Sequence, residues 1–240
     1  MAPQPHEGAA EVIRAFAHGA GAPLIDVAGA YRWERLAHGL RGQDVRIKGP
    51  RGVIETRLPL LGAHQVENAA TAVATADALR ERGHDLSEDA VAHGLAGVSW
   101  PGRLEVLRES PLVLADGAHN RDSARRLREA LRDYFSCGRV LFIVGSSVGK
   151  DIGGLAEELA PVAERVVAVR ADHPRAMAPE RIAGAFVALG IDVDVCDNVG
   201  QAIDTAMAEV GRDGVICLVG SLFVAAEGRA HMVPDRGAGG

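Results

Sequence analysis

The sequence predicts an α/β fold in which a mostly parallel sheet is flanked by helices, preceded by a smaller α+β region. Two observations carry this prediction. From residue 112 onward, short runs of Val, Ile and Leu alternate with amphipathic segments, a pattern typical of βαβ units and a parallel sheet. Residues 1–99 lack this alternation and contain few strand-like runs for their length. The chain therefore divides into two regions with different architectures.

The front region is predicted to contain three helices and a β-hairpin. Val45 and Ile47 alternate with polar residues before a Gly-Pro-Arg-Gly turn, and the alternation resumes after it, which indicates a hairpin. The small residues Ala69, Ala72 and Ala76 recur at helical spacing, so the longest helix could pack closely along them. In chain order, the predicted elements are helix 9–20, strands 45–47 and 54–58 around the turn 49–52, helix 65–82 and helix 87–95.

The second region is predicted to alternate strictly between strands and helices. Asn120 is a good N-cap for its first helix, and Ala124, Leu127, Leu131 and Phe135 form one apolar stripe along it. The predicted strands are 112–115, 140–144, 166–169, 193–195 and 215–219, and the helices that follow them are 121–135, 151–161, 179–189, 200–210 and 222–230.

Composition excludes several classes of protein. With 240 residues and 48% hydrophobic content, the chain can bury a large core, and its net charge of -6 leaves no basic face for nucleic acid or an anionic membrane. Cys137, Cys196 and Cys217 are widely spaced, which favours reduced thiols over a disulfide framework. No secretory leader or membrane-spanning apolar run is apparent, so we expect a cytoplasmic protein.

The motif with the strongest functional signal is Asp116-Gly117-Ala118-His119-Asn120, which follows an apolar strand and opens a helix. Backbone N–H groups and the helix dipole favour an anion at such a position. Asn120 is best explained as a helix cap. Asp116 could be a turn former, but the small Gly-Ala pair leaves room for Asp116 and His119 at the strand's carboxyl end, which favours a functional role.

The segment Trp100-Pro101-Gly102-Arg103 precedes that strand. Trp100 is best explained as packing, and the Pro-Gly pair as a turn. A guanidinium held just beyond a rigid turn can offer a fixed pair of donors to a phosphate, which a flexible lysine does less well. Arg103 is therefore a candidate phosphate contact.

Three further residues are weaker candidates. Lys150 could contact an anion, but its glycine-rich loop, 145–151, lacks the spacing and the Ser/Thr of a P-loop. Ser221, after the last strand, could equally be an N-cap or a ligand hydroxyl. Asn68 lies in the first turn of the Ala-rich helix, where its carboxamide could bind a nucleobase edge or a phosphate. No dinucleotide fingerprint, nucleophile elbow or metal-ligand spacing of His residues occurs.

Taken in order, these motifs resemble the folylpolyglutamate synthase/dihydrofolate synthase family of the ATP-dependent Mur ligase superfamily. The resemblance runs from near residue 10 to about 230 and rests on the stretch 61–72, Trp100 to Arg103, Asp116 to Asn120, the Lys150-Asp151 pair and the Gly220-Ser221 pair. It implies a Rossmann-like C-terminal domain over residues 100–232 and the closing part of a central domain over 1–99. The glycine-rich end of the chain separately predicts a flexible tail over 233–240.

The resemblance also implies a reaction. In such ligases a carboxylate attacks the γ-phosphate of ATP, and the amino group of L-glutamate attacks the resulting acyl phosphate; the substrate would be a folate or dihydropteroate. It implies that Asn68 lies near adenine, Arg103 near phosphate and Asp116 near ribose. His119, Ser221 and Lys150 would belong to the glutamate end of the site, with His119 and Arg103 as the catalytic pair.

The sequence departs from the family's full pattern. The family carries an N-terminal domain with a P-loop, Mg²⁺-binding Ser, Glu and His residues and a carbamylated lysine, none of which has a match here. Gly149 also replaces an acidic residue common before the Lys-Asp pair. We therefore expect a C-terminal portion that is incomplete alone, with Mg²⁺ ligands mainly in the absent part.

Three alternatives stay open at this stage. The chain could be an inactive nucleotide- or partner-binding module, or one half of a split ligase that a separate P-loop domain completes in trans. A ligase that adds amino acids to peptidoglycan precursors fits the fold, but it fits the residues from Trp100 to Arg103 and from His64 to Asn68 less well.

Overall fold

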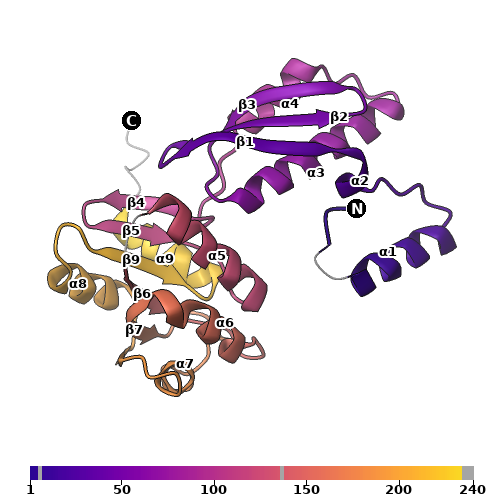
Figure 1. The fold of residues 1–240 in the computed structure, drawn as a ribbon. Helices are drawn as coiled ribbons and strands as arrows, with labels where there is room; N and C mark the ends of the chain where they lie inside the picture. Colours follow the sequence, from indigo (N-terminus) through magenta and orange to yellow (C-terminus); the bar gives the residue numbers. More distant parts are fainter. Residues whose placement is uncertain (5–6, 136–137, 234–240) are drawn as a thin grey trace, which may run out of the picture. The chain divides into compact units, whose positions relative to one another are not determined.

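The computed structural model describes residues 1–4, 7–135 and 138–233. The chain forms two compact units, Met1–Ser99 and Trp100–Gly240, whose helices and strands are labelled in Figure 1. Cys137 and the greater part of the tail expected at 233–240 lie outside the described residues. Each unit is considered by itself below.

The first unit contains an antiparallel sheet of three strands in the order β1-β2-β3. The predicted hairpin is confirmed, because β2 and β3 pair from Gln43↔Leu58 to the turn at Gly49↔Gly52. One more strand than predicted is present, since β1 pairs with β2 along its length. Most of β1 is exposed, so its sequence carries little alternation of apolar and polar residues. The bounds are β1 Arg32–Gly39, β2 Gly42–Gly49 and β3 Gly52–Leu58.

Helix α3 covers one face of this small sheet. The side chains that it buries include Val66, Ala70, Val73 and Ala74, which pack with residues of β2 and β3 in one apolar cluster. The packing stripe expected along Ala69, Ala72 and Ala76 was therefore only partly right, because Ala72 is exposed. The helices of this unit are α1 Glu7–Gly19, α2 Val27–Ala30, α3 Ala63–Glu81 and α4 Glu88–Ala96.

The second unit is built on a sheet of six strands in the order β4-β5-β9-β6-β7-β8. All neighbouring pairs from β5 to β8 are parallel, which confirms the predicted architecture, and β4 adds an antiparallel edge. Strands β6 and β9 are buried at every position, as expected when helices cover both faces. The bounds are β4 Glu105–Glu109, β5 Leu112–Ala115, β6 Val140–Val144, β7 Ala163–Val169, β8 Val193–Cys196 and β9 Val215–Val219.

Helices form a layer on each face of this sheet (Figure 1). On one side, α5 packs against α6 and α6 against α7; on the other side, α8 packs against α9. Residues of α8 and α9 share an apolar cluster with Leu141 and Ile143 of β6, which alternate with Phe142 and Val144 on the opposite face. The bounds are α5 Arg121–Tyr134, α6 Ile152–Leu159 with a 3₁₀ turn at Ala160–Val162, α7 Pro179–Val187, α8 Val199–Glu209 and α9 Leu222–Met232.

The strand order places a topological switch point at the centre of this sheet. Strand β9 is last in the sequence but lies between β5 and β6. The chain leaves β5 and β6 toward α5 and α6 on one face, and leaves β9 toward α9 on the other. Ligands of open α/β sheets bind where neighbouring connections diverge in this way, at the carboxyl ends of the strands. The topology therefore points to the ends of β5, β9 and β6.

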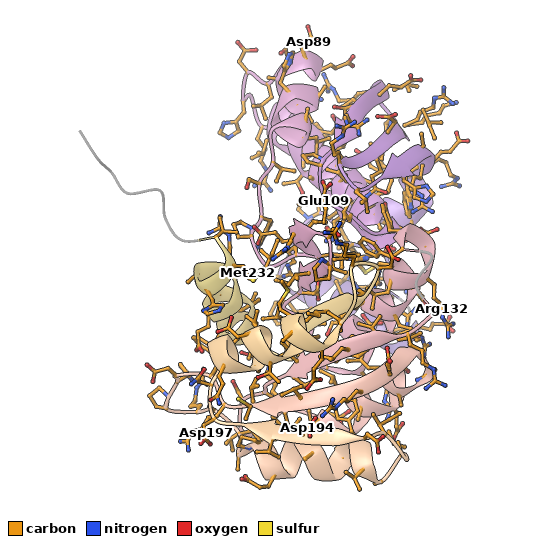
Figure 2. The ribbon with its side chains drawn as sticks, turned by 90° about the vertical axis from the view of Figure 1, so that its left-hand side faces the viewer. Asp89, Glu109, Arg132, Asp194, Asp197 and Met232 are labelled. Carbon is orange, nitrogen blue, oxygen red and sulfur yellow. The ribbon has the colours of Figure 1, made fainter. Side chains whose placement is uncertain are left out.

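Charged side chains mark both edge strands of the sheet. Glu109 ends β4, and Asp194 lies on β8, where it pairs with Arg165 of β7. Both acidic residues are labelled in Figure 2. Charges on an edge strand discourage pairing with the sheet of another molecule.

Candidate functional site

Arg103 lies in a tight turn whose backbone is held on both sides. The N–H of Gly102 donates to Glu105 Oε2 at 2.9 Å, and the N–H of Leu104 donates to Asp116 Oδ2 at 2.8 Å. Leu104 has φ 45°, the one positive φ at a non-glycine residue in the described part of the chain. Such a backbone conformation persists only where its surroundings enforce it. The turn therefore fixes where the Arg103 side chain starts.

The Arg103 guanidinium is exposed and lies 5.6 Å from the centroid of the Trp100 ring, a cation–π contact. Trp100 is itself 58% exposed, so its predicted role as buried packing in this part of the chain was wrong. The indole instead restricts the directions that the guanidinium can take. Arg103 can thus present its donors to an anion with little loss of side-chain freedom.

Asp116 joins this turn to the end of β5. Its Oδ1 accepts the N–H of Ala118 at 2.8 Å, while Oδ2 accepts that of Leu104. The N–H of Gly117 donates to the carbonyl of Gly102 at 2.8 Å, which ties the same two segments together again. The carboxylate is therefore a turn former, and through Leu104 it positions Arg103.

Burial raises the pKa of the Asp116 carboxyl from 3.8 to about 6, even though the residue retains some exposed surface. The N–H groups of Ala118 and Leu104, and then the charges of Arg103 and His119, oppose this rise by stabilising the carboxylate. Arg103 and His119 are thus close enough to act on Asp116. The grouping of these three residues that the sequence predicts is present in the structure.

His119 is oriented by its own loop. Its Nδ1 lies 2.9 Å from the carbonyl oxygen of Gly117, which can only accept, so Nδ1 carries the proton. In the neutral ring, Nε2 is then the acceptor. The next residue, Asn120, forms a capping box with Ser123 at the start of α5, as expected for an N-cap. His119 is therefore held with Nε2 as its chemically available atom.

Ser221 follows Gly220 at the end of β9 and is 7% exposed. Its Oγ accepts the N–H groups of Phe223 at 2.9 Å and Val224 at 3.4 Å, so it caps α9. Gly220 has φ 100°, and a Cβ there would lie 2.5 Å from the carbonyl oxygen of Gly145. The ends of β9 and β6 thus approach each other through glycine. The structure shows the cap, and the hydroxyl can still donate its proton to a ligand.

Lys150 lies in the loop between β6 and α6 and is exposed. Asp151 caps α6 by accepting the N–H of Gly154 at 2.8 Å, so this segment is a helix-capping loop, as the sequence favours over a P-loop. The loop also contains Ser146, which the sequence analysis did not single out. Its place after Gly145 repeats the Gly220-Ser221 arrangement, and that repeat was the available signal.

Asn68 belongs to the first unit, where it is exposed on the first turns of α3. Its Nδ2 donates to Oε1 of the buried Gln65 at 2.9 Å. Arg103, Asp116, His119, Lys150 and Ser221 all belong to the second unit, at the carboxyl edge of its sheet. The predicted role of Asn68 as a nucleotide contact stays a prediction.

Within residues 1–4, 7–135 and 138–233, no three His, Cys, Asp or Glu side chains are grouped as a metal site would require. Cys196 and Cys217 form no disulfide. No helix in those ranges has the length and apolar character to cross a membrane. The site is therefore one of arginine, carboxylate, imidazole, hydroxyl and backbone N–H groups, which suits anionic ligands.

Comparison with known families shows which family the chain belongs to. The model of the Mur ligase glutamate ligase domain matches residues 102–222, just over half of the chain. The chain belongs to the Mur ligase family. The match starts at Gly102 and ends at Leu222, so it spans Arg103, Asp116 and Ser221.

Relatives of known name narrow the similarity within the Mur ligases. The chain is 36% identical over 77% of its length to a probable bifunctional folylpolyglutamate synthase/dihydropteroate synthase of Haloferax volcanii, covering 22% of that protein. It is 36% identical over 70% of its length to the dihydrofolate synthase/folylpolyglutamate synthase of Mycobacterium tuberculosis, covering 36% of it. These relatives confirm the predicted resemblance.

A solved structure agrees with this assignment. Folylpolyglutamate synthase of Mycobacterium tuberculosis, crystallised with ADP and AMPPCP, superposes with a TM-score of 0.83 at 31% identity. The superposition covers 94% of this chain and 53% of the solved one. The chain thus spans about half of that Mur ligase and about a fifth to a third of the two curated relatives.

Proposed function

We propose that this chain is the C-terminal portion of an ATP-dependent folylpolyglutamate/dihydrofolate synthase, which joins L-glutamate to a folate or dihydropteroate carboxylate. The observation that carries the proposal is the grouping of Arg103, Asp116 and His119 at the end of β5, inside the segment matched as a glutamate ligase domain. The names of the relatives support the choice of substrate class.

The proposed reaction has two steps. The carboxylate of the acceptor attacks the γ-phosphorus of ATP, which gives an acyl phosphate and releases ADP. The amino group of L-glutamate, after losing a proton, then attacks the acyl carbon; the tetrahedral intermediate collapses to an amide and expels phosphate. Negative charge develops on phosphoryl oxygens in the first step and on the former carbonyl oxygen in the second, so fixed positive groups lower both barriers.

Arg103 is assigned to the phosphates of ATP. Its guanidinium starts from a turn fixed by Glu105 and Asp116 and is restricted by Trp100, so its donors meet the phosphoryl oxygens with little reorganisation. Asp116 is assigned two tasks: it holds the turn through Leu104, and its remaining lone pairs can accept from a ribose hydroxyl. Asn68 is assigned to the adenine.

His119 is assigned to the amino group of L-glutamate. With Nδ1 donating to Gly117, Nε2 can accept a proton from the incoming amine as it attacks the acyl carbon. Ser221 and Lys150 are assigned to the carboxylates of L-glutamate, the first through its hydroxyl proton and the second through its charge. Both residues follow strands that end at the same edge as β5.

Mg²⁺ is expected to bind mainly through another part of the ligase, as the resemblance to the folylpolyglutamate synthase/dihydrofolate synthase family implies. No step above is assigned to a metal held by this chain. A P-loop domain, either covalently joined or supplied as a separate protein, would hold the phosphates from the opposite side. A cytoplasmic location remains a prediction.

The test is ligation by this chain combined with a P-loop half, measured as ATP-dependent incorporation of labelled L-glutamate into dihydropteroate or tetrahydrofolate. We expect Arg103→Ala and Asp116→Ala to lower the rate at least a hundredfold, on the order of 3 kcal/mol of lost transition-state stabilisation. Arg132→Ala is the matched control, because Arg132 is an exposed arginine of α5, and it should retain the full rate.

Other outcomes separate the alternatives. Wild-type rates in both site variants would refute the assignment of Arg103 and Asp116. Tight ATP binding without ligation, even with the P-loop half present, would indicate a binding module without enzymatic activity. Ligation that appears only on mixing two separately encoded halves would indicate a split ligase.

A further inference from the structure

Ser146 has a buried hydroxyl that no described residue satisfies. The residue is 5% exposed, and its Oγ lacks a hydrogen-bond partner. Its carbonyl accepts the N–H of Met177 at 2.8 Å. A buried hydroxyl without a partner costs about 1–3 kcal/mol, so folded proteins rarely retain one without a reason. The reason must lie in what this hydroxyl faces.

The alternation along β6 gives the direction of the Ser146 side chain. Leu141 and Ile143 pack in the cluster formed with α8 and α9. A Cβ at Gly145 would point the same way, because it would lie 2.6 Å from Val224 of α9, and the N–H of Gly145 still pairs with Val219 of β9. Side chains alternate along extended backbone, so Ser146 points to the other face, where α6 begins.

The start of α6 favours an anion. Its first-turn N–H groups and its dipole carry partial positive charge, and Lys150, two residues before the helix, adds an exposed ammonium. Arg121, at the start of the neighbouring α5, reaches the same turn, where its Nε lies 3.0 Å from the position of a Cβ on Gly154. Two acidic groups lie here as well: Asp151 uses Oδ1 to cap Gly154, and Glu157 pairs with Arg121 at 2.6 Å.

A second loop covers this position. Ser147 forms a β-bridge with Ala176, in the segment between β7 and α7. In the same segment, His173 stacks on Phe223 of α9, with ring centroids 3.8 Å apart and planes 21° from parallel. Strand β6 lies between β7 and β9. The stacked pair therefore joins the segment after β7 to the helix after β9, on either side of the end of β6. Shielding from water strengthens a hydrogen bond made beneath such a cover.

We propose that the Ser146 hydroxyl donates a hydrogen bond to an anionic oxygen of the ligand, a carboxylate or a phosphate, bound against the start of α6. The assignment of that oxygen to L-glutamate or to a nucleotide rests on the proposed function; the anion site itself does not. Ser146 thus adds a ligand-binding residue beside Lys150, in the same loop after β6.

The experiment titrates the full chain with L-glutamate, with ADP and with inorganic phosphate, following the backbone amide NMR signals of residues 146–154. At least one of these probes should shift these signals, and Ser146→Ala should weaken its binding about tenfold, the effect of losing one hydrogen bond to a charged group. Ser147→Ala is the matched control, because Ser147 is adjacent and engages the covering loop through its backbone. It should bind as the wild type does.

Thermal unfolding gives a second readout that needs no ligand. Without ligand, Ser146→Ala should match or exceed the melting temperature of the wild type, because it removes a hydroxyl that has no protein partner. Lower stability combined with unchanged ligand binding would assign the hydroxyl to a structural water, which overturns the proposal. Failure of all three probes to shift residues 146–154 would overturn it as well.

The two proposals can fail separately. If the reconstituted ligase is active and Ser146→Ala leaves KM unchanged for every substrate, the function stands and the Ser146 assignment fails. If no ligation is found but Ser146→Ala weakens phosphate or L-glutamate binding, the anion site stands and the proposed function fails.

Discussion

Two loops follow the carboxyl ends of neighbouring strands in one sheet: residues 116–120 after β5 and residues 145–151 after β6. They differ in how their polar side chains are used. In the first, polar side chains are used on the loop's own backbone: Asp116 binds two N–H groups, His119 binds a carbonyl and Asn120 caps a helix. In the second, Asp151 caps a helix, while Lys150 is exposed and the Ser146 hydroxyl has no described partner.

This difference separates two ways in which a loop can serve a site. The loop after β5 is a rigid frame that fixes Arg103 and His119, so substitutions within it should alter stability together with activity. The loop after β6 offers groups that its own fold does not need, so substitutions there should alter ligand binding with little change in stability. Substitutions in and around the two loops test this contrast.

Gly220→Ala should destabilise the protein most, by about 3 kcal/mol or more. The substitution adds a Cβ at φ 100°, 2.5 Å from the carbonyl oxygen of Gly145, so the backbone beneath both loops must shift. Urea unfolding followed by circular dichroism measures the effect. Gly149→Ala is the control, since Gly149 has φ 86° with open space around it, and only about 1 kcal/mol of strain is expected. Equal losses would contradict the close approach of β9 to β6.

Ionisation of Asp116 should make stability fall as the pH rises from about 4 to about 6. The folded carboxyl has its pKa raised to about 6 by burial, so the folded state holds this proton more tightly than the unfolded state. The contribution is present below pH 4 and is lost above pH 6, a change of roughly 1–3 kcal/mol.

Asp116→Asn should remove this component from the pH dependence of the free energy of unfolding. Asp122→Asn is the control with the opposite sign, because a hydrogen bond from Arg125 lowers the pKa of the Asp122 carboxyl. That substitution removes a contribution that is present above pH 4 and lost as the pH falls. If Asp116→Asn leaves the pH dependence of the free energy of unfolding unchanged, burial does not raise the pKa of the Asp116 carboxyl.

Asn120→Ala should cost about 1 kcal/mol, the usual effect of losing an N-cap. The Asn120 side chain accepts the N–H of Ser123, and the Ser123 side chain accepts the N–H of Asn120. The substitution removes the first of these hydrogen bonds, so the first turn of α5 is held less firmly. Asn120→Asp retains an acceptor and serves as the control. Amide hydrogen exchange in α5 should rise in the alanine variant alone, and protection equal to the wild type would argue against a rigid frame.

Lys150→Ala should change stability by less than about 0.5 kcal/mol, because Lys150 is exposed. The same variant should raise the KM for L-glutamate in the reconstituted ligase, if Lys150 binds a glutamate carboxylate. Lys48→Ala, at an exposed lysine of the first unit, controls for the loss of one positive charge. A large loss of stability in Lys150→Ala would contradict the contrast between the two loops.

Much of the second unit could be predicted from sequence because the strands at the centre of its sheet are buried on both faces. Strands β5, β6 and β9 have the bounds expected from their apolar runs, 112–115, 140–144 and 215–219. The helix cap Asn120 also acts as expected, since capping is a local interaction between a side chain and the next turn. The same reasoning about strand ends predicted that Asp116 and His119 lie together at the end of β5.

Two edge strands, β1 and β4, escaped prediction, whereas the edge strands β3 and β8 were predicted as 54–58 and 193–195. Strands β1 and β4 carry several charged residues and are only partly buried, so neither presents an apolar run or a clean alternation. Such strands are held by backbone hydrogen bonds to the neighbouring strand. This pairing does not require a recognisable pattern of apolar side chains, so a partly polar sequence does not reveal it. The exposed Trp100 and the buried Ser146 were missed for a related reason, because burial depends on which segments pack over a residue.

Local sequence patterns account for most of the strands and helices, for the glycines and caps at their ends, and for the motifs that mark a Mur ligase. These are properties of neighbouring residues, and local sterics and hydrogen bonding express them directly. Packing in three dimensions places β9 between β5 and β6, brings Asp116 back to the turn of Arg103, and puts a second loop over Ser146. Those contacts join residues far apart in the chain, so their geometry depends on how the layers pack.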